Sequence, residues 1–337
     1  MVTLKQLAAD LGVSHGLVSR VLSNRMGNTG VSEKTRQTIL SRAKELNYRP
    51  NPNASALKRG LRGSVGVFLH KIGAQGTELN LTFVDKVATC LSDRGLNLLV
   101  RVFEEDEEFL TACNPALFRR IDGLIVAGIW HHSLALKLNQ FEADGLHVVT
   151  ACHGANHNSS IPNFEVDQEM QGYIATRHLI EIGCRNIAHI NIRPPRHQGY
   201  LNAHQEAGLA TDPRLNIDTE DFTRQSGYQA MQKLHTLGIP FDGLVAQADS
   251  QAAGAMYYLL EKGHPKESWP KITGVDDSPI ASDYCAIPLT SVTAEMKTSA
   301  EMAVAAIVSK IEGGTATSCL IPPRLVVRES TVPGTLA

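Results

Sequence analysis

The sequence predicts a small all-α helix-turn-helix head, joined by a hinge helix to an α/β body of two doubly wound parallel-sheet lobes. Three observations support this fold class. Short apolar patterns of helical period, separated by a glycine-containing turn, occupy residues 1–49. From residue 63 onward, apolar strand-like runs alternate with amphipathic segments, as in parallel sheets covered on both faces. The segments IDGLIVAG (121–128) and FDGLVAQA (241–248) resemble each other and indicate two similar lobes.

The first predicted helix begins after Thr3, which forms a capping box pattern with Gln6. Gly12 ends this helix, and Ser14 is suited to cap the next one. Apolar residues lie on one stripe of the first helix, at Leu4, Leu7, Ala8 and Leu11. A third helix is predicted from Ser32, with Ile39, Ala43 and Leu46 in period, and Tyr48 closes the small core.

The second helix buries a stripe made of Leu17, Val18, Val21 and Leu22. Its outer face then carries His15, Gly16, Ser19 and Arg20. Glycine inside a helix costs about 1 kcal/mol relative to alanine, so Gly16 favours a close approach of the backbone to base pairs. Arg20 is suited to a bidentate contact with guanine. His15 fits a base or phosphate contact and an ordinary exposed histidine equally well.

Charge is distributed unevenly along the chain. Residues 1–62 hold eleven Lys or Arg and three Asp or Glu, whereas the other 275 residues hold 21 basic and 31 acidic side chains. A head of charge +8 on a body of charge −10 indicates a polyanionic partner for the head. The alternative is a basic surface without a partner.

The segment 50–62 is predicted to be a hinge. Pro50 and Pro52 stop the third helix, and Ala54, Leu57 and Lys58 share one face of a short helix. About eight residues are too few for a stable isolated helix, so this segment is expected to fold on binding. A Pro-rich flexible linker is the alternative.

Seven strands and at least three helices are predicted in the body. The strands are 65–69, 96–102, 123–127, 147–151, 187–192, 243–247 and 272–275, and the helices include 83–93, 170–182 and 252–262. Two doubly wound lobes of this kind bind a ligand between them, at the carboxyl ends of their strands.

The segments VTLKQLAADLGVSHGLVSRVLSNR and VSEKTRQTILSRAKELNYRPN resemble the head of the LacI/GalR family of bacterial transcription regulators. The chain departs from the family pattern at Leu17, usually Thr, at Gly16, which usually carries a side chain, and in a longer loop at 24–30. The resemblance implies that Leu57 wedges into the minor groove, although Ser55 replaces a common Arg there. The DNA-contacting residues it implies are Thr3, Ser14, His15, Gly16, Ser19, Arg20, Asn24, Ala54, Leu57 and Lys58.

The body resembles the family more loosely, except for a closely matching tail, IPPRLVVREST (321–331). The family body has the fold of periplasmic sugar-binding proteins, whose chain crosses three times between lobes. These crossings are expected near 163, 291 and 323. The expected domains are the head (1–49), the hinge (50–62) and an effector-binding and dimerisation domain (63–337), with lobe one at 63–163 and 292–322 and lobe two at 164–291 and 323–337.

The resemblance also implies ligand-binding residues in lobe two. Arg196 belongs to the R-x-x-G-[FY] motif RHQGY and is suited to grip hydroxyl pairs or a carboxylate. Asp276, in GVDD, is expected to accept from sugar hydroxyls, and Phe222 to pack on a sugar or purine ring. For each residue, the alternative is a strand-end charge or a core aromatic.

Other pocket positions are less clearly matched. Asp249 is a weaker ligand-binding candidate, since Ala248 replaces the Asn of the family's Asn-Asp pair, and an expected Asp is replaced near Cys152. In lobe one, His70 and Lys71 follow the first strand and are expected to face the cleft. The effector therefore stays unidentified.

Metal, cofactor and membrane association are not expected. The histidines at 131, 132, 147, 153 and 157 lack the spacing of a metal site, and the six cysteines show no ligand-like pairing, as is typical of reduced thiols. No signal peptide or run of about 20 apolar residues is present, which predicts a cytoplasmic protein.

The leading hypothesis is a ligand-responsive transcription regulator, a repressor controlled by a sugar or similar metabolite. It would bind a near-palindromic double-stranded DNA operator as a homodimer. An enzyme is disfavoured because G-x-S-x-G, Walker, G-x-G-x-x-G and H-E-x-x-H motifs are missing. The alternative is a small-molecule binding protein or an enzyme using the two-lobed cleft, with the head serving only as an interaction module. A transport-type binding protein would need a secretion signal and no basic head.

Overall fold

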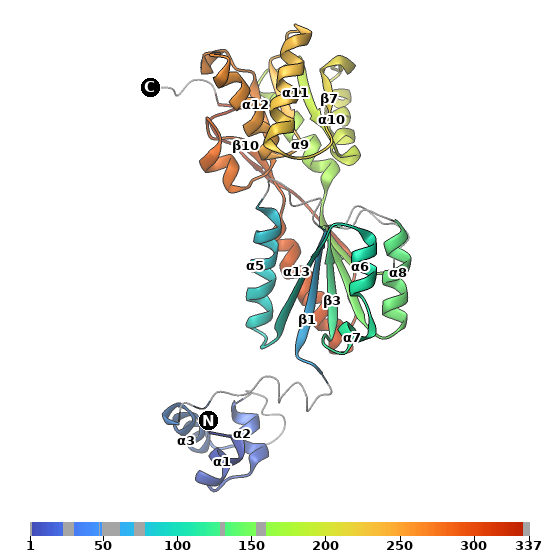
Figure 1. The fold of residues 1–337 in the computed structure, drawn as a ribbon. Coiled ribbons are helices and arrows are strands. Elements are labelled where there is room, and N and C mark those ends of the chain that lie inside the picture. Colours follow the sequence, from blue (N-terminus) through green and yellow to red (C-terminus); the bar gives the residue numbers. More distant parts are fainter. Residues whose placement is uncertain are drawn as a thin grey trace. The chain divides into compact units, whose positions relative to one another are not determined.

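The chain forms two compact units, Met1–Gly63 and Ser64–Ala337. The computed structural model describes residues 2–22, 30–46, 48, 61–70, 78–128, 132–152 and 160–332. Figure 1 shows the helices and strands of both units. Within the described part of the chain, none of the helices combines the length and the hydropathy that crossing a bilayer requires.

The first unit contains the three predicted helices, α1 (Leu4–Asp10), α2 (His15–Leu22) and α3 (Glu33–Glu45). The capping box is confirmed, since the hydroxyl of Thr3 accepts from the backbone N–H of Gln6, whose side chain accepts from the N–H of Thr3. Ser14 accepts from the N–H of Leu17, and Ser32 caps α3. The helices enclose a core of Leu7, Ala8, Val18, Val21, Ile39 and Ala43, on which Tyr48 packs as predicted.

The second unit begins with lobe one, a six-stranded parallel sheet of order β11-β5-β4-β3-β1-β2. Its strands are β1 (Ser64–His70), β2 (Asn97–Phe103), β3 (Gly123–Ala127), β4 (His147–Ala151), β5 (Asn163–Val166) and β11 (Cys319–Ile321). Helices α5 (Leu79–Ser92) and α13 (Met296–Ile311) cover one face. The opposite face carries α6 (Asp106–Ala112), α7 (Pro115–Phe118) and α8 (His132–Ala143) (Figure 1).

Lobe two repeats this strand order as β12-β10-β9-β8-β6-β7, with only β12 antiparallel to its neighbour. Its strands are β6 (Ile187–Asn191), β7 (Asn216–Asp218), β8 (Gly243–Ala246), β9 (Lys271–Asp276), β10 (Thr290–Thr293) and β12 (Leu325–Val326). Its main helices are α9 (Gln168–Glu181), α10 (Pro194–Glu206), α11 (Arg224–Leu237) and α12 (Asp249–Glu261). Leu244 and Val245 pack into different cores, so both faces of the sheet are covered. The predicted α/β fold class is confirmed.

The similar segments 121–128 and 241–248 occupy equivalent places in the two lobes. Each contains the third strand of its lobe, β3 or β8, beside the first and fourth strands. The aspartate before each strand accepts backbone N–H groups at the start of the lobe: Asp122 from Ser64, and Asp242 from Arg185 and Asn186. The repeated Asp-Gly therefore ties two neighbouring strands together at the same corner.

The chain passes between the two sheets three times. It leaves lobe one after β5, returns between β10 and α13, and crosses again between β11 and β12. These short connections bring residues from both lobes to one region, where the carboxyl ends of the parallel strands meet.

Facing glycines set the spacing of the helices in lobe two. A Cβ at Gly172 would lie 2.0 Å from the carbonyl oxygen of Arg196, and one at Gly199 would lie 1.9 Å from that of Glu169. Helices α9 and α10 therefore pack backbone to backbone. Gly227 and Gly254 bring α11 and α12 together in the same way, each with a Cβ position 2.0 Å from a carbonyl oxygen.

Candidate functional site

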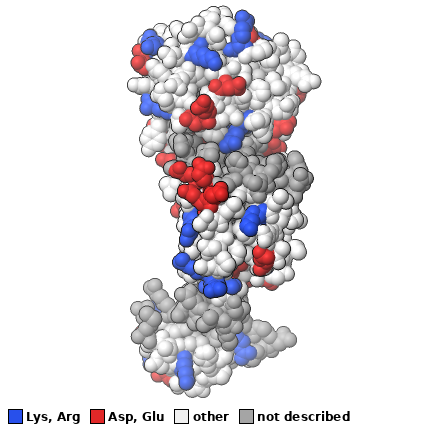
Figure 2. All heavy atoms as spheres, turned by 45° about the vertical axis from the view of Figure 1, so that its right-hand side comes forward, with Lys and Arg blue, Asp and Glu red and all other residues white. Residues whose placement is uncertain are grey.

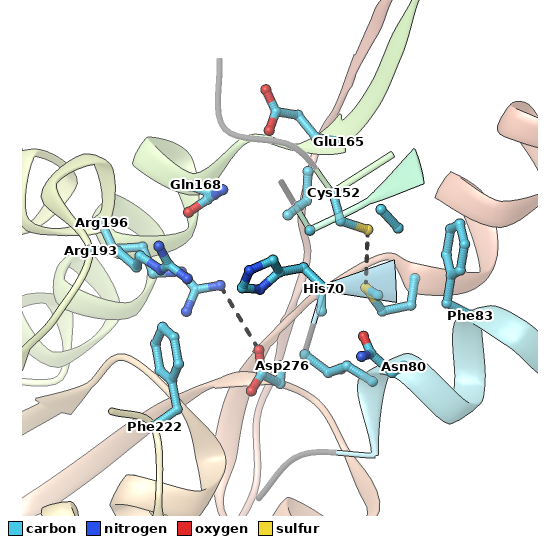
Figure 3. Close-up of a pocket in the computed structure, with 16 residues that line it drawn as sticks. His70, Asn80, Phe83, Cys152, Glu165, Gln168, Arg193, Arg196, Phe222 and Asp276 are labelled. Carbon is cyan, nitrogen blue, oxygen red and sulfur yellow. Dashed lines mark hydrogen bonds and ion pairs between the residues drawn. The ribbon is translucent and has the colours of Figure 1, made fainter. Parts of the chain in front are cut away.

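A pocket of about 100 Å³ lies between the lobes of the second unit, at the carboxyl ends of strands from both sheets. Figure 3 shows side chains from the two lobes facing each other across it. The lining includes Val166 at the end of β5, Gln168 at the start of α9, and Arg193, Arg196, Phe222 and Asp276 of lobe two. The remaining lining residues are His70, Leu79, Asn80, Phe83, Ala127, Gly128, Cys152, Glu165, Ala294 and Met296.

Arg196 lies in the first turn of α10 and is buried. Its Nε donates to Oε1 of Gln171 at 3.1 Å, and its Nη1 donates to the backbone oxygen of Gln247 at 2.5 Å. Its Nη2 lies 4.0 Å from Oδ1 of Asp276 (Figure 3). The guanidinium is thus held by α9 and by the residue that follows β8, and it lines the pocket.

Asp276 ends β9 with a backbone φ of 123°, a conformation that is costly for a residue other than glycine. Its side chain is buried, and within the described residues its Oδ1 has no hydrogen-bond partner. Burial raises the pKa of Asp276 well above its ordinary value, while the charge of Arg196 opposes that shift. Such an unsatisfied buried acceptor at a pocket wall is suited to a ligand hydroxyl.

Two guanidinium groups pack against the ring of Phe222. The guanidinium carbon of Arg193 lies 5.2 Å from the ring centroid, and that of Arg196 lies 5.8 Å from it. These cation–π contacts hold the arginines on the lobe-two wall.

Lobe one supplies His70 and Glu165 to the opposite wall. His70 ends β1 and packs edge-on against Phe103, with ring centroids 5.1 Å apart. Glu165 is buried, and its Oε2 has no hydrogen-bond partner among the described residues. Burial raises the pKa of Glu165 to about 8.

Asp249 does not line this pocket, although the sequence made it a candidate. It is fully buried, and its carboxylate accepts from the hydroxyl of Ser291 and from the N–H and hydroxyl of Ser278. Burial raises the pKa of Asp249, while these hydrogen bonds oppose the shift. The carboxylate therefore fixes the loop that follows Asp276 at the end of β9.

The structure therefore brings His70, Arg196, Phe222 and Asp276 together, while Lys71 lies outside the described residues. Sequence reasoning missed Arg193, Glu165 and Gln168. Arg193 follows a parallel strand directly, and residues at such strand ends commonly face a ligand. No comparable signal marks Glu165, in the four-residue strand β5, or Gln168, the first residue of α9, because both flank a crossing whose path the sequence only approximates.

The head places a second candidate surface on the outer side of α2. His15, Gly16 and Arg20 are exposed, Ser19 is partly exposed, and Val18 and Val21 turn inward to the core. A Cβ built at Gly16 would meet nothing within 4 Å, so packing within the head does not require glycine there. Thr3 and Ser14 lie at helix N-termini, where their hydroxyls act as caps.

Each acidic side chain of the head pairs with an arginine of α3. Asp10 and Glu45 pair with Arg42, and Glu33 pairs with Arg36 of α3. All three acids of residues 1–62 are therefore neutralised on or beside α3, while α2 carries no acidic residue. The outer face of α2 is thus suited to a polyanion. Asn24, Ala54, Leu57 and Lys58 lie outside the described residues.

Figure 2 shows the charged side chains on one face of the molecule. Acidic and basic groups are interspersed over the two lobes, and basic side chains are visible on the described part of the head. In the described residues, no group of three or more His, Cys, Asp or Glu is arranged to hold a metal ion.

A three-helix head with an exposed second helix, followed by a separate two-lobed body with a pocket at its strand ends, defines a class of protein. That class is the ligand-responsive, DNA-binding transcription regulators. Sequence profiles agree with both parts. Residues 3–51 match "Bacterial regulatory proteins, lacI family", and residues 176–331 match "Periplasmic binding protein-like domain". The chain belongs to the LacI/GalR family of bacterial transcription regulators.

Relatives of the full length support this assignment. The chain is 29% identical to the HTH-type transcriptional regulator GalS of Salmonella typhimurium, over 98% of this chain and 96% of that protein. It is 29% identical to the transcriptional repressor PurR of Haemophilus influenzae, over 98% of both chains. A solved complex of the regulator CelR with cellobiose has 26% identity and a TM-score of 0.70, covering 98% of this chain and all of that one.

Proposed function

We propose that this regulator is a repressor that responds to a sugar or similar small metabolite bound between its lobes. The main support is the buried pair of Arg196 and Asp276 beside the Phe222 ring, because it offers a donor, an unsatisfied acceptor and an apolar face. The similar CelR chain binds cellobiose, which supports a carbohydrate-like effector. In this proposal His70 forms part of the lobe-one wall, Asp249 acts only indirectly by fixing the loop after β9, and the protein acts by binding rather than by catalysis.

On DNA, we propose a homodimer whose two α2 helices enter successive major grooves of a near-palindromic operator. His15, Gly16, Ser19 and Arg20 face the bases, while Thr3, Ser14 and Asn24 contact the backbone. The domains are the head (1–49), the hinge (50–62) and the body (63–337). A regulator of genomic DNA of this kind acts in the bacterial cytoplasm.

Effector binding is proposed to act by shifting the balance between an operator-binding and a non-binding arrangement of the lobes. An effector that binds the non-binding arrangement more tightly weakens operator binding by the ratio of its two affinities. An effector that binds the operator-binding arrangement more tightly strengthens operator binding by the ratio of its two affinities.

The direct test is titration of the purified full chain against its own upstream promoter fragment, at low ionic strength. A panel of sugars, sugar phosphates, uronates and purines is then added to the complex. A specific complex whose affinity changes with a compound supports the proposal. If no complex forms with or without the compounds, the regulator function is refuted.

Replacing Arg196 or Asp276 by alanine is expected to make operator binding insensitive to the effector. Each change removes a buried charged partner, which lowers effector affinity about 10- to 100-fold. Operator affinity without effector stays near wild type, because neither residue belongs to the head. Fluorescence anisotropy with increasing effector measures both values.

The matched control is Arg214→Ala, since Arg214 is exposed and pairs with Asp212 on the surface of lobe two. That variant is expected to respond as wild type does. A normal effector response in both pocket variants would show that the pocket is misassigned.

Replacing Leu57 by alanine is expected to weaken specific operator binding by roughly tenfold or more and to reduce the bend of the DNA. The physical reason is that a side chain inserted between base pairs opens the minor groove and stabilises the kink. Electrophoretic mobility of permuted fragments measures the bend. Leu136→Ala is the control, because Leu136 is 76% exposed on lobe one. Unchanged affinity and bend in L57A would rule out the hinge assignment.

A further inference from the structure

The lobe-two wall of the pocket carries a second arginine beside the one that the family motif provides. Arg193 lies between β6 and α10 and lines the pocket together with Arg196. Both guanidinium groups lie within 6 Å of the Phe222 ring, and Figure 3 shows them on the same side of the pocket, facing His70 of lobe one.

Gln247 fixes both arginines in place. Its side-chain Oε1 accepts from the backbone N–H of Arg193 at 2.6 Å, and its backbone oxygen accepts from Nη1 of Arg196. Its side-chain Nε2 also lies 3.1 Å from Nε2 of the buried His189 and donates to Asn191. The residue that follows β8 therefore holds the backbone of Arg193 and the guanidinium of Arg196, which reduces the ordering that ligand binding requires.

Two guanidinium groups held this close in a half-buried site raise each other's electrostatic energy. Burial lowers the pKa of Arg193 to about 10, and the charge of Arg196 adds to this effect. Burial likewise lowers the pKa of Arg196, while the charges of Asp276 and Asp249 oppose that shift. Negative charge brought against this wall would relieve the repulsion, and arginine is the side chain that binds carboxylate or phosphate oxygens in a bidentate way.

Among the described lining residues of the opposite wall, Glu165 is the one acidic side chain. Burial raises the pKa of Glu165 to about 8, so its carboxyl is mostly protonated at pH 7. Within the described residues, Oε2 of Glu165 and Oδ1 of Asp276 have no hydrogen-bond partners. Both groups are suited to hydroxyls of a ligand, because each is a buried acceptor at the pocket surface.

We propose that the effector is an anion: a small hydroxylated molecule whose carboxylate or phosphate group binds Arg193 and Arg196 while its hydroxyls reach Asp276 and Glu165. This inference rests on the proposed effector site and specifies its ligand class. The lobe-two wall holds two guanidinium groups, one buried and one half-buried, against a single carboxyl, that of Asp276. A neutral sugar adds no negative charge to this wall, whereas a sugar acid or sugar phosphate supplies it and still offers hydroxyls to Asp276 and Glu165.

The test compares ligands that share a sugar ring and differ in the group at C6, which is neutral in the parent sugar and anionic in its derivatives. Glucose, glucuronate and glucose 6-phosphate form one set, and galactose, galacturonate and galactose 6-phosphate form the other. Isothermal titration calorimetry on the full-length protein, with ionic strength held equal, gives each affinity. We expect at least one anion to bind ~10- to 100-fold more tightly than its neutral parent sugar, the range of a charge-assisted hydrogen bond. Comparison of the carboxylate and phosphate members identifies the anionic group.

Three variants separate charge from packing. Arg193→Gln is expected to reduce the preference for the anion about tenfold or more, with little effect on the neutral parent. Arg193→Lys keeps the positive charge and is expected to restore part of that preference. Arg214→Gln is the control on the surface of the same lobe and is expected to change neither affinity.

The inference is overturned if the neutral sugars bind as tightly as their anions, if none of the anions binds, or if R193Q weakens both ligands equally. None of these results would by itself refute the proposed regulator function, because that function is tested separately by operator binding. A neutral sugar that changes operator affinity would refute the anionic effector and still support the regulator.

Discussion

Deleting residues 1–62 is expected to abolish specific operator binding while leaving effector affinity unchanged. The two units have separate cores: the head packs Leu7, Val18 and Ile39 together, and the strands of both sheets begin at Ser64 or later. The deletion also removes eleven Lys or Arg and leaves a body in which acids outnumber bases by 31 to 21. A net-negative body repels the phosphate backbone of DNA. The full chain, in contrast, has a basic head, and attraction between basic side chains and phosphates supplies most of the non-specific affinity for DNA.

Fluorescence anisotropy against the promoter fragment, over a series of salt concentrations, measures the loss. The full chain is expected to lose affinity steeply as salt rises, whereas the truncated chain shows no complex even at low salt. Calorimetry with the effector, and a thermal unfolding curve, check that the isolated body is folded. Retained operator binding by the truncated chain would place the DNA interface in the body.

The head was predictable because local rules decide its structure. The capping pair Thr3–Gln6, the turn at Gly12 and the N-cap Ser32 each act within a few residues, and apolar spacing defines what is buried. The sequence also indicated two similar lobes from the repeated Asp-Gly segments. The physical reason appears only in the structure, where Asp122 and Asp242 each hold the start of a neighbouring strand.

Several elements of the body were not predicted, for reasons of length and composition. Strands β5, β10 and β11 have three or four residues, and β10 (TSVT) contains a single strongly apolar side chain, although all four of its residues are buried. Their burial comes from partners distant in sequence, because they flank the crossings between lobes. Periodicity within a short window carries no information about such partners.

In the candidate site, too, the sequence identified some residues correctly and misjudged another. Arg196, Phe222 and Asp276 were found through family motifs, and they do line one pocket. Asp249 has the same strand-end character in sequence, but two serines hold its carboxylate inside lobe two. Sequence alone does not tell whether a strand-end acid faces a ligand or a neighbouring loop, since this depends on hydrogen-bond partners more than 25 residues away.

Replacing Gly199 by alanine is expected to destabilise lobe two strongly. The new Cβ would lie 1.9 Å from the carbonyl oxygen of Glu169 and 2.5 Å from the backbone nitrogen of Tyr173. Backbone atoms of a packed helix cannot turn aside as a flexible side chain does, so α9 and α10 must separate. Overpacking costs 1–3 kcal/mol or more, and we expect about 3 kcal/mol here, because this loss exceeds the gain of about 1 kcal/mol in helix propensity.

The separation also reaches the pocket, because α10 carries Arg196 and α9 carries Gln171, which accepts its hydrogen bond. G199A is therefore expected to lower the melting temperature of the body by about 6–12 °C and to weaken effector binding as well. Circular dichroism melting and calorimetry measure the two effects. Gln198→Ala, an exposed neighbour on the same helix, is the control and is expected to shift the melting temperature by about 2 °C or less. If G199A melts as the control does, the two helices can move apart at little cost, and the glycine in the R-x-x-G-[FY] motif requires an explanation other than close helix packing.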